Sequence, residues 1–147
     1  MKICVACSSG GHLTEILQIR DIFDKRNNFF ITFKRKDSEE LAEKEKVYFV
    51  SDPKRNPISL IVNIFQSFGI FLKEKPDVVI STGAGVAVPV CYIAKLFGKK
   101  IIFFESFCRI HEKSLSGKLI YPIADLFFVQ WPEMKKMYPK AKVGSVF

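Results

Sequence analysis

The first residues whose types and spacing could do chemistry form the turn Ser9-Gly10-Gly11-His12. The apolar run Ile3–Ala6 precedes this turn, and apolar residues three or four apart follow it, which predicts a buried strand, a glycine turn and a helix. Backbone N–H groups and the positive end of a helix would then meet at Ser9, Gly10 and Gly11, where a phosphate would be stabilised. His12 would lie in the first helical turn, facing the same anion, and an imidazole there could act as a general base.

The same turn also has simpler explanations. Gly10 and Gly11 could be present only because a tight turn needs positive φ angles. His12 could be a hydrogen-bonded residue at the start of a helix. The spacing is not G-x-G-x-x-G, so the sequence does not carry the dinucleotide-binding fingerprint.

Three more groups of glycines or polar residues directly follow predicted strands. These groups are Lys34-Arg35 after residues 29–33, Thr82, Gly83 and Gly85 after residues 78–80, and Glu105 after residues 101–104. The carboxyl ends of parallel strands share one edge of a sheet, so all these groups should converge on one cleft. The cleft would favour a ligand with phosphate and hydroxyl groups.

The charged residues of this cleft would have different roles in binding such a ligand. Lys34, Arg35 and Arg109 could neutralise phosphate groups, although solvated surface charge is the simpler explanation for at least one of them. Glu105 could accept a hydroxyl of the ligand or replace His12 as the base, whereas a lone glutamate after a strand often only stabilises a turn.

Strand and helix patterns alternate along the chain. The strands are expected at residues 3–6, 29–33, 47–50, 78–80, 101–104, 126–129 and 143–147, and the helices at 13–23, 39–44, 58–73, 86–97, 119–124 and 133–137, with a loop over 107–117. This alternation predicts an α/β fold, a Rossmann-like parallel sheet with helices on both faces. The length of 147 residues fits one domain, residues 1–147.

The segment Ile58–Lys73 is the most apolar helix that the sequence predicts. Its polar residues form one narrow stripe, and its apolar run of about 15 residues is shorter than the roughly 20 that a membrane span needs. Either the helix is packed on two sides, inside the protein or against a partner, or its outer face rests on a membrane. The residues expected on this membrane or partner face are Ile61, Ile64, Phe65, Phe68, Phe71 and Leu72, with the basic residues Lys54, Arg55, Lys73 and Lys75 beside them.

The composition excludes several other classes. The formal charge is +8, but the basic clusters are short and no RNA-binding signature accompanies them, so nucleic acid is not an expected partner. Cys4 and Cys7 would point to opposite faces of a strand, and all four cysteines are expected to be buried in a reduced, cytoplasmic protein. No metal-ligand spacing and no signal peptide is recognised, and neither a metal nor a cofactor is expected.

Three blocks of the sequence together carry a family resemblance. SSGGHLTE, DVVISTGAG and FFESFCRIHEKSLSGKLIYPIADLFFVQWPEMKKMYP resemble the capsular and exopolysaccharide glycosyltransferase subunits of the PssD and CpsF type. That family is related to the membrane-anchoring "Alg fourteen" subunit of the transferase that makes dolichol-linked N,N′-diacetylchitobiose. The resemblance covers nearly the whole chain, and the last block is its most specific part. A more distant likeness is to the N-terminal half of MurG-type enzymes.

The resemblance implies the acceptor-side half of a GT-B glycosyltransferase that works with a second polypeptide. A separate donor-binding subunit of the Alg thirteen or PssE type would hold a UDP-sugar, and the pair would transfer N-acetylglucosamine or another hexose to a polyprenyl- or dolichyl-pyrophosphate-linked sugar. The chain would be inactive alone, and it would attach peripherally to the cytoplasmic face of a membrane.

The resemblance also suggests roles for the residues of the two glycine turns. Ser9, Gly10 and Gly11 would bind the acceptor pyrophosphate, or the donor phosphate from across the cleft. Thr82, Gly83 and Gly85 would line the acceptor sugar, and His12 or Glu105 would be the base. Two alternatives remain: a non-catalytic membrane adaptor, and a stand-alone nucleotide-binding Rossmann enzyme. The second is disfavoured because Lys34-Arg35-Lys36 stands where an acidic ribose-binding residue would be expected.

Overall fold

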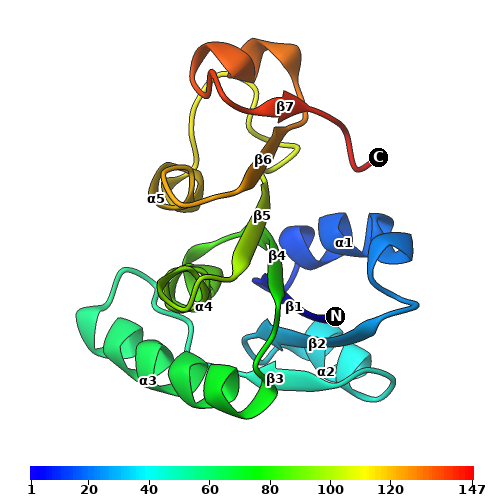
Figure 1. The fold of residues 1–147 in the computed structure, drawn as a ribbon, viewed down its shortest axis with the longest axis vertical. Coiled ribbons are helices and arrows are strands. Elements are labelled where there is room, and N and C mark those ends of the chain that lie inside the picture. The colour runs from blue at the N-terminus through cyan, green and yellow to red at the C-terminus, as the bar shows by residue number, and fades with distance from the viewer.

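A computed structural model describes all 147 residues and contains one seven-stranded sheet (Figure 1). The strands are β1 Lys2–Cys7, β2 Asn27–Thr32, β3 Val47–Phe49, β4 Val78–Gly83, β5 Lys100–Phe104, β6 Leu126–Val129 and β7 Lys142–Val143. Their order is β3-β2-β1-β4-β5-β6-β7, and every neighbouring pair is parallel. This doubly wound order confirms the Rossmann-like fold, and it places the topological switch point between β1 and β4.

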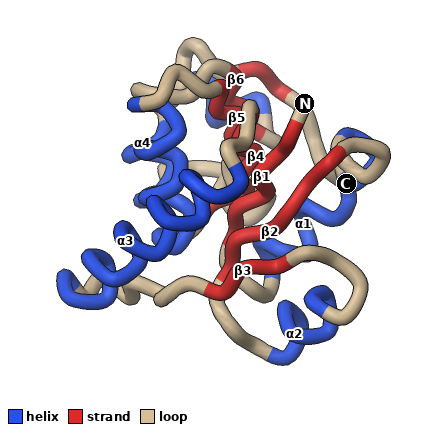
Figure 2. Tube along the Cα trace, turned by 60° about the horizontal axis from the view of Figure 1, so that its bottom comes forward, coloured by secondary structure: helices blue, strands red, loops and turns tan.

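Helices cover both faces of the sheet, as Figure 2 shows for α3 and α4 on one side and α1 and α2 on the other. The α-helices are α1 Gly11–Gln18, α2 Lys36–Ala42, α3 Pro57–Glu74, α4 Val88–Leu96 and α5 Leu115–Ile120, and the 3₁₀ turns are η1 Arg20–Ile22, η2 Gly85–Ala87 and η3 Pro132–Lys136. Alternate residues of the strands feed two hydrophobic clusters, one with 21 and one with 10 buried residues. The sheet is therefore buried on both faces, which explains its nearly continuous apolar strands.

The cysteines illustrate this alternation. Cys4 belongs to the larger cluster and Cys7 to the smaller one, so the two thiols point to opposite faces as predicted. Burial raises the pKa of both Cys7 and Cys91 to about 12, which makes these thiols poor nucleophiles. Cys108 is exposed in the loop after β5, so the prediction that all four cysteines are buried is wrong at that position.

The element boundaries differ from the sequence prediction mainly near the C-terminus. Helix α5 begins at Leu115 rather than at residue 119, because the Ser114 hydroxyl caps it by accepting a hydrogen bond from the Gly117 N–H at 2.9 Å. The predicted strand over 143–147 is limited to Lys142–Val143.

Helix α3 is attached to the domain by its polar stripe. Asn63 and Ser67 are buried, and the Asn63 amide donates to the Ser51 carbonyl at 2.8 Å and to the Val86 carbonyl at 3.2 Å. Ser67 in turn donates to the Asn63 side-chain oxygen at 2.8 Å. The four buried residues of α3 (Asn63, Ser67, Phe71 and Glu74) all lie on this side, so the prediction of a helix packed on two sides within the protein is wrong.

The remaining surface of α3 is apolar and faces outward. We call it the apolar α3 face; its exposed residues are Ile58, Leu60, Ile61, Val62, Ile64, Phe65, Phe68 and Leu72. Phe71 was expected on this face but is buried, with its ring centroid 4.9 Å from that of Phe97. No helix of the structure is both long enough and apolar enough to span a bilayer.

The last turn of α3 is held by a buried carboxylate. Glu74 accepts hydrogen bonds from the Lys2 ammonium at 3.1 Å, the Lys46 ammonium at 2.5 Å and the Tyr48 hydroxyl at 2.5 Å. Burial alone would raise the pKa of Glu74, but these three partners lower it from 4.5 to about 2.

The lowered pKa predicts a pH-dependent contribution of Glu74 to stability. The contribution is complete above pH 4.5 and is lost as the pH falls towards about 2. We expect Glu74→Gln to lower the free energy of unfolding by about 2 kcal/mol at pH 7 and by much less at pH 3, measured by urea unfolding. Asp24→Asn, which removes an exposed ion pair with Arg20, is the control and should have little effect. Equal losses from Glu74→Gln at both pH values would contradict this account.

Candidate functional site

The turns after β1 and β4 are bonded to each other at the switch point of the sheet. The Ser8 N–H donates to the Gly83 carbonyl at 3.3 Å, and the Thr82 hydroxyl donates to the His12 carbonyl at 2.7 Å. These bonds fix the first turn of α1, and therefore the position of His12, against the end of β4.

Thr82 and Gly83 support His12 from inside the protein. Both are buried, so this structure does not present them at the surface, where the acceptor sugar was expected. Gly83 has φ +110°, and a Cβ atom there would lie 2.9 Å from the Ser116 hydroxyl and 3.6 Å from Cε1 of His12. The glycine is needed for this backbone conformation and for the close approach of the Ser116 hydroxyl.

Two polar groups of the first glycine turn already have hydrogen-bond partners within the protein. The Gly10 N–H donates to the Asp37 carboxylate at 2.6 Å, and the buried Ser9 hydroxyl donates to the Phe33 carbonyl at 2.8 Å. These two groups therefore do not meet a phosphate in this structure, contrary to the prediction. Gly11 is exposed, and the N–H groups of the first turn of α1 have neither an intrahelical partner nor a side-chain cap.

A pocket of about 440 Å³, which we call the central pocket, lies beside this helix start. His12, Gly85 and Arg109 line it, as the sequence predicted for one cleft. The structure adds residues that were not predicted as site residues: Asp52, Pro53, Lys54, Arg55, Leu60, Ala84, Val88, Ser114, Leu115, Ser116 and Leu119. The pocket thus combines three cationic side chains, one carboxylate and a set of aliphatic residues.

The backbone around the central pocket is strained. Lys54, Arg55 and Ala84 have φ angles of +45°, +59° and +71°, which residues with a Cβ rarely adopt. The Ala84 N–H is held by the Ser116 hydroxyl at 3.2 Å. Such strain is typical of functional sites, where the surrounding structure keeps residues in unfavourable conformations.

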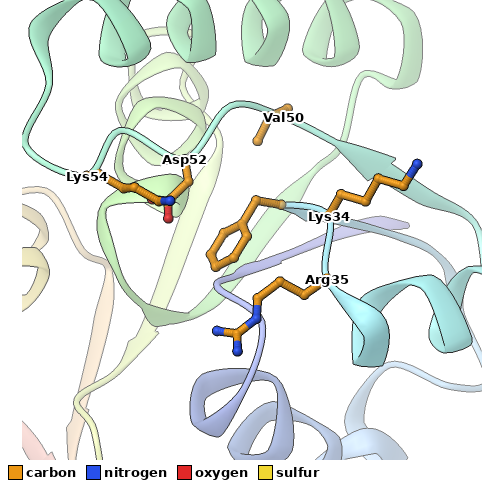
Figure 3. A pocket seen from close by; sticks show the side chains of 6 residues that line it. Lys34, Arg35, Val50, Asp52 and Lys54 are labelled. Atoms are coloured by element: carbon orange, nitrogen blue, oxygen red, sulfur yellow. The ribbon is translucent and has the colours of Figure 1, made fainter.

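Lys34 and Arg35 lie outside the central pocket. They line a neighbouring hollow of about 500 Å³ together with Phe33, Val50, Asp52 and Lys54 (Figure 3). Figure 3 shows the two basic side chains pointing in opposite directions, and the Lys34 ammonium lies 3.5 Å from Glu39. The predicted single cleft is therefore divided in two, with Asp52 and Lys54 between the halves.

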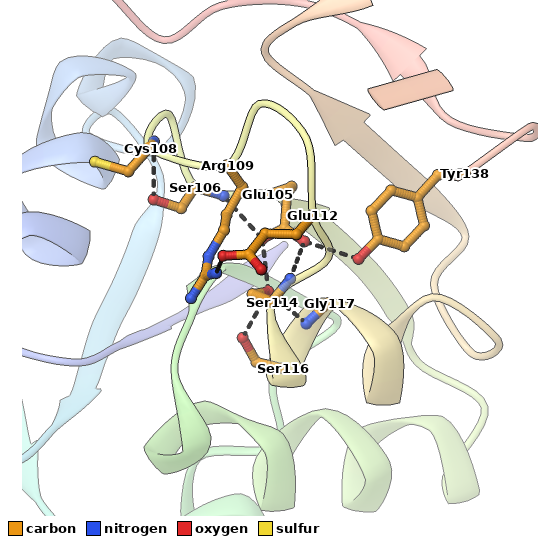
Figure 4. Close-up of polar contacts among 9 residues, drawn as sticks. All are labelled: Glu105, Ser106, Cys108, Arg109, Glu112, Ser114, Ser116, Gly117 and Tyr138. Atoms are coloured by element: carbon orange, nitrogen blue, oxygen red, sulfur yellow. Dashed lines mark hydrogen bonds and ion pairs between the residues drawn. The ribbon is translucent and has the colours of Figure 1, made fainter. Parts of the chain in front are cut away.

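Glu105 is the centre of a buried hydrogen-bond network (Figure 4). Its carboxylate accepts from the Ser106 N–H at 3.0 Å, the Ser114 N–H at 3.1 Å, the Ser114 hydroxyl at 2.6 Å and the Tyr138 hydroxyl at 2.8 Å. Burial, together with the bond to this carboxylate, raises the pKa of Tyr138. Only 1% of Glu105 is exposed, so this structure does not present its carboxylate to the hydroxyl that it was expected to bind or deprotonate.

The network around Glu105 shapes the site indirectly. It joins the end of β5 to the start of α5, and these elements flank the loop that carries Arg109. Gln130 reinforces the join by donating to the Glu105 carbonyl at 3.0 Å, and the Trp131 indole donates to the Phe107 carbonyl at 2.6 Å. Arg109 itself forms an exposed ion pair with Glu112 at 2.7 Å.

One sequence signal could have identified the missed cations. Lys54 and Arg55 follow β3 at its carboxyl end, which is the rule that pointed to the other groups, but the sequence alone associated them with α3. The structure contains no cluster of three or more His, Cys, Asp or Glu side chains that could hold a metal ion.

Comparison with known families places these features in context. Residues 51–147 match the family described as "Oligosaccharide biosynthesis protein Alg14 like". The human UDP-N-acetylglucosamine transferase subunit ALG14 is 31% identical over 96% of this chain and 80% of its own length. The subunit alg14 of Schizosaccharomyces pombe is 42% identical over 60% of this chain and 42% of its own length.

Two solved structures share the fold at low sequence identity. UDP-N-acetylglucosamine 2-epimerase from Rickettsia bellii superposes with a TM-score of 0.77 at 17% identity, and MurG from Acinetobacter baumannii with 0.73 at 15%. They cover 99% and 90% of this chain, but the chain covers only 45% and 43% of theirs. The chain therefore has the fold of about half of each of these proteins.

Proposed function

Since the chain belongs to the Alg14-like family of oligosaccharide biosynthesis proteins, we propose that it is the acceptor-side subunit of a two-chain GT-B glycosyltransferase. A second subunit would bind the UDP-sugar, which the names of the relatives suggest is UDP-N-acetylglucosamine. The pair would transfer the sugar to a lipid-pyrophosphate-linked sugar at the cytoplasmic face of a membrane.

One observation carries this proposal: Leu60 belongs both to the central pocket and to the apolar α3 face. The charged part of a ligand in the pocket would therefore lie directly beside an exposed apolar surface of the protein. Lipid-pyrophosphate sugars combine these two chemistries, since a polar diphosphate joins a sugar to a long hydrocarbon chain. A free nucleotide would gain nothing from the apolar side.

Different residues of the central pocket would contact different parts of such a ligand. Lys54, Arg55 and Arg109 would neutralise the pyrophosphate, assisted by the free N–H groups at the start of α1. Leu115 and Leu119 of α5 would contact the first isoprene units. His12 would take the proton from the acceptor hydroxyl.

The apolar α3 face would rest on the membrane. Phe65 is 73% exposed, and the exposed Lys73 in the last turn of α3 would meet anionic headgroups. An exposed apolar surface of this kind on a folded domain indicates a site of interaction with a membrane or another protein. The donor-binding subunit would then close over the central pocket from the cleft side, as the second domain does in a GT-B fold.

Replacing a cation of the central pocket tests whether the ligand is a lipid pyrophosphate or a nucleotide. We expect Arg55→Ala to weaken binding of a short-chain polyprenyl-pyrophosphate N-acetylglucosamine by about 10-fold or more, because a charge-assisted hydrogen bond contributes about 1.5–3 kcal/mol. Isothermal titration with the chain in detergent measures this, and Arg26→Ala, at an exposed position outside the pocket, is the matched control. Tight binding of UDP-N-acetylglucosamine or a flavin to the chain alone, unaffected by Arg55→Ala, would instead support a stand-alone nucleotide-binding enzyme.

A further inference from the structure

The structure has two buried side-chain polar atoms without a hydrogen-bond partner, and they lie one turn apart on α1. These atoms are Nδ1 of His12 and Oε2 of Glu15. Residues three apart on a helix share a face, with Cβ atoms roughly 5–6 Å apart. Unpaired buried polar atoms are costly and rare, so two on one face of a helix call for a common explanation.

Glu15 is an unusual residue for its position. Only 5% of it is exposed, although it lies on a helix with an exposed side. One carboxylate oxygen, Oε1, accepts from the Ser106 hydroxyl at 3.1 Å and from the Phe107 N–H at 3.2 Å. These bonds fix the orientation of the carboxylate and leave Oε2 without a partner.

The His12 ring is asymmetric in the same way. Nδ1 is buried, whereas Nε2 makes no hydrogen bond and is not among the buried atoms, on a residue that lines the central pocket. The backbone of His12 is fixed through its carbonyl by Thr82. The ring therefore has one nitrogen turned into the protein and one that is free.

We propose that Glu15 is the positioning residue for His12. Its free oxygen would accept the Nδ1–H of the imidazole, through a bridging water or after a small rotation of the ring. This bond would select the tautomer in which Nε2 carries no proton and can act as an acceptor. The inference rests on the proposed function, because it assigns a task to Nε2 in transfer.

The acceptor hydroxyl oxygen forms a bond to the anomeric carbon of the donor sugar while its proton passes to Nε2 of His12. The bond between that carbon and the UDP oxygen breaks, and UDP leaves with the electron pair. The imidazolium that forms would be stabilised by the Glu15 carboxylate, which keeps its charge throughout.

Glu15→Gln is a directed test because the glutamine has only one favourable orientation. Its carbonyl oxygen must face the Phe107 N–H, so its NH₂ group takes the place of Oε2. That group donates rather than accepts, which favours the opposite tautomer, with Nε2 protonated. Changes of this kind in a catalytic triad leave the geometry intact and lower kcat by about 10⁴-fold.

The first readout needs no partner and no activity. The chain has two histidines, His12 and His111, so ¹⁵N NMR of the imidazoles is simple, and His111→Gln assigns the signals. We expect the Nδ1–H tautomer for His12 in the unmodified chain, and a shift towards the Nε2–H tautomer in Glu15→Gln. Ser106→Ala, which removes one anchor but keeps Oε2, should retain the Nδ1–H tautomer. An Nε2–H tautomer in the unmodified chain would overturn the inference even if Glu15→Gln failed to fold.

The second readout is transfer by the reconstituted pair. We expect Glu15→Gln and His12→Ala each to lower kcat by about 10²–10⁴-fold, and the double variant to be no worse than His12→Ala alone. If the loss of kcat in the double variant equalled the product of the two single losses, Glu15 would act independently of His12 and would only support the loop after β5. Unchanged turnover in His12→Ala would instead contradict the catalytic part of the proposed function, while the tautomer measurement would still decide the link between the two residues.

Discussion

Gly117→Ala is expected to lower the free energy of unfolding by about 3 kcal/mol or more. A Cβ atom at this position would clash with Oε2 of Glu105 and would lie 2.5 Å from the Tyr138 hydroxyl and 2.8 Å from the Ser114 hydroxyl. These are the groups of the buried Glu105 network, so any shift that relieves the clash would disturb its hydrogen bonds. The methyl group would either push the carboxylate off its partners or displace the start of α5.

Gly69→Ala provides the matched control for this prediction. Gly69 lies within α3, and a Cβ there would contact nothing within 4 Å. Alanine is the better helix former, so this variant should be about 0.5–1 kcal/mol more stable. Urea unfolding followed by circular dichroism measures both changes. If Gly117→Ala proved as stable as the unmodified chain, the Glu105 network would not hold the site as described.

The second large effect is expected on the apolar α3 face. A chain with both Ile61→Glu and Phe65→Glu should lose at least about 100-fold in binding to vesicles that contain an anionic lipid, measured by flotation. These side chains are 53% and 73% exposed and make the outward surface of a helix that is attached by its opposite side. Burying two large apolar side chains contributes about 3 kcal/mol or more to membrane binding, and glutamate would add repulsion from anionic headgroups.

Ile22→Glu is the control for surface hydrophobicity in general. Ile22 is 51% exposed in η1, on the side of the sheet away from α3. This variant should float like the unmodified chain. Undiminished flotation of the α3 variant, combined with loss of binding to the donor subunit, would assign the apolar α3 face to the partner instead of the membrane.

The fold could be predicted because its signals are local. Each strand is a short apolar run and the crossovers carry helical patterns, so the parallel sheet follows from general rules. The strand order and its switch point come from the structure. The rule that strand ends converge brought His12 and Gly85 to one pocket, and Arg109, in the loop after β5, lines that pocket too. The boundaries of α5 were wrong because a single hydroxyl, that of Ser114, sets its start.

Several residues that were expected to contact a ligand are instead hydrogen-bonded to residues of this chain that are distant in sequence. Gly10 is bonded to Asp37, Thr82 to the carbonyl of His12, and Glu105 to Tyr138. A sequence shows which groups reach a strand end, but not which of them are already hydrogen-bonded there. The orientation of α3 was hidden for a similar reason, since the carbonyls that pair with Asn63 lie in other segments.

We propose that this chain holds the acceptor and that another chain brings the donor. The most direct test of this proposal is transfer of radiolabelled N-acetylglucosamine from the UDP-sugar to a lipid-pyrophosphate N-acetylglucosamine, with and without the donor-binding subunit. We predict transfer by the pair, none above background by this chain alone, and loss of transfer by the pair when Arg55 and Arg109 are both replaced by alanine. Robust transfer by this chain alone would contradict the claim, as would full activity of the pair without the two arginines.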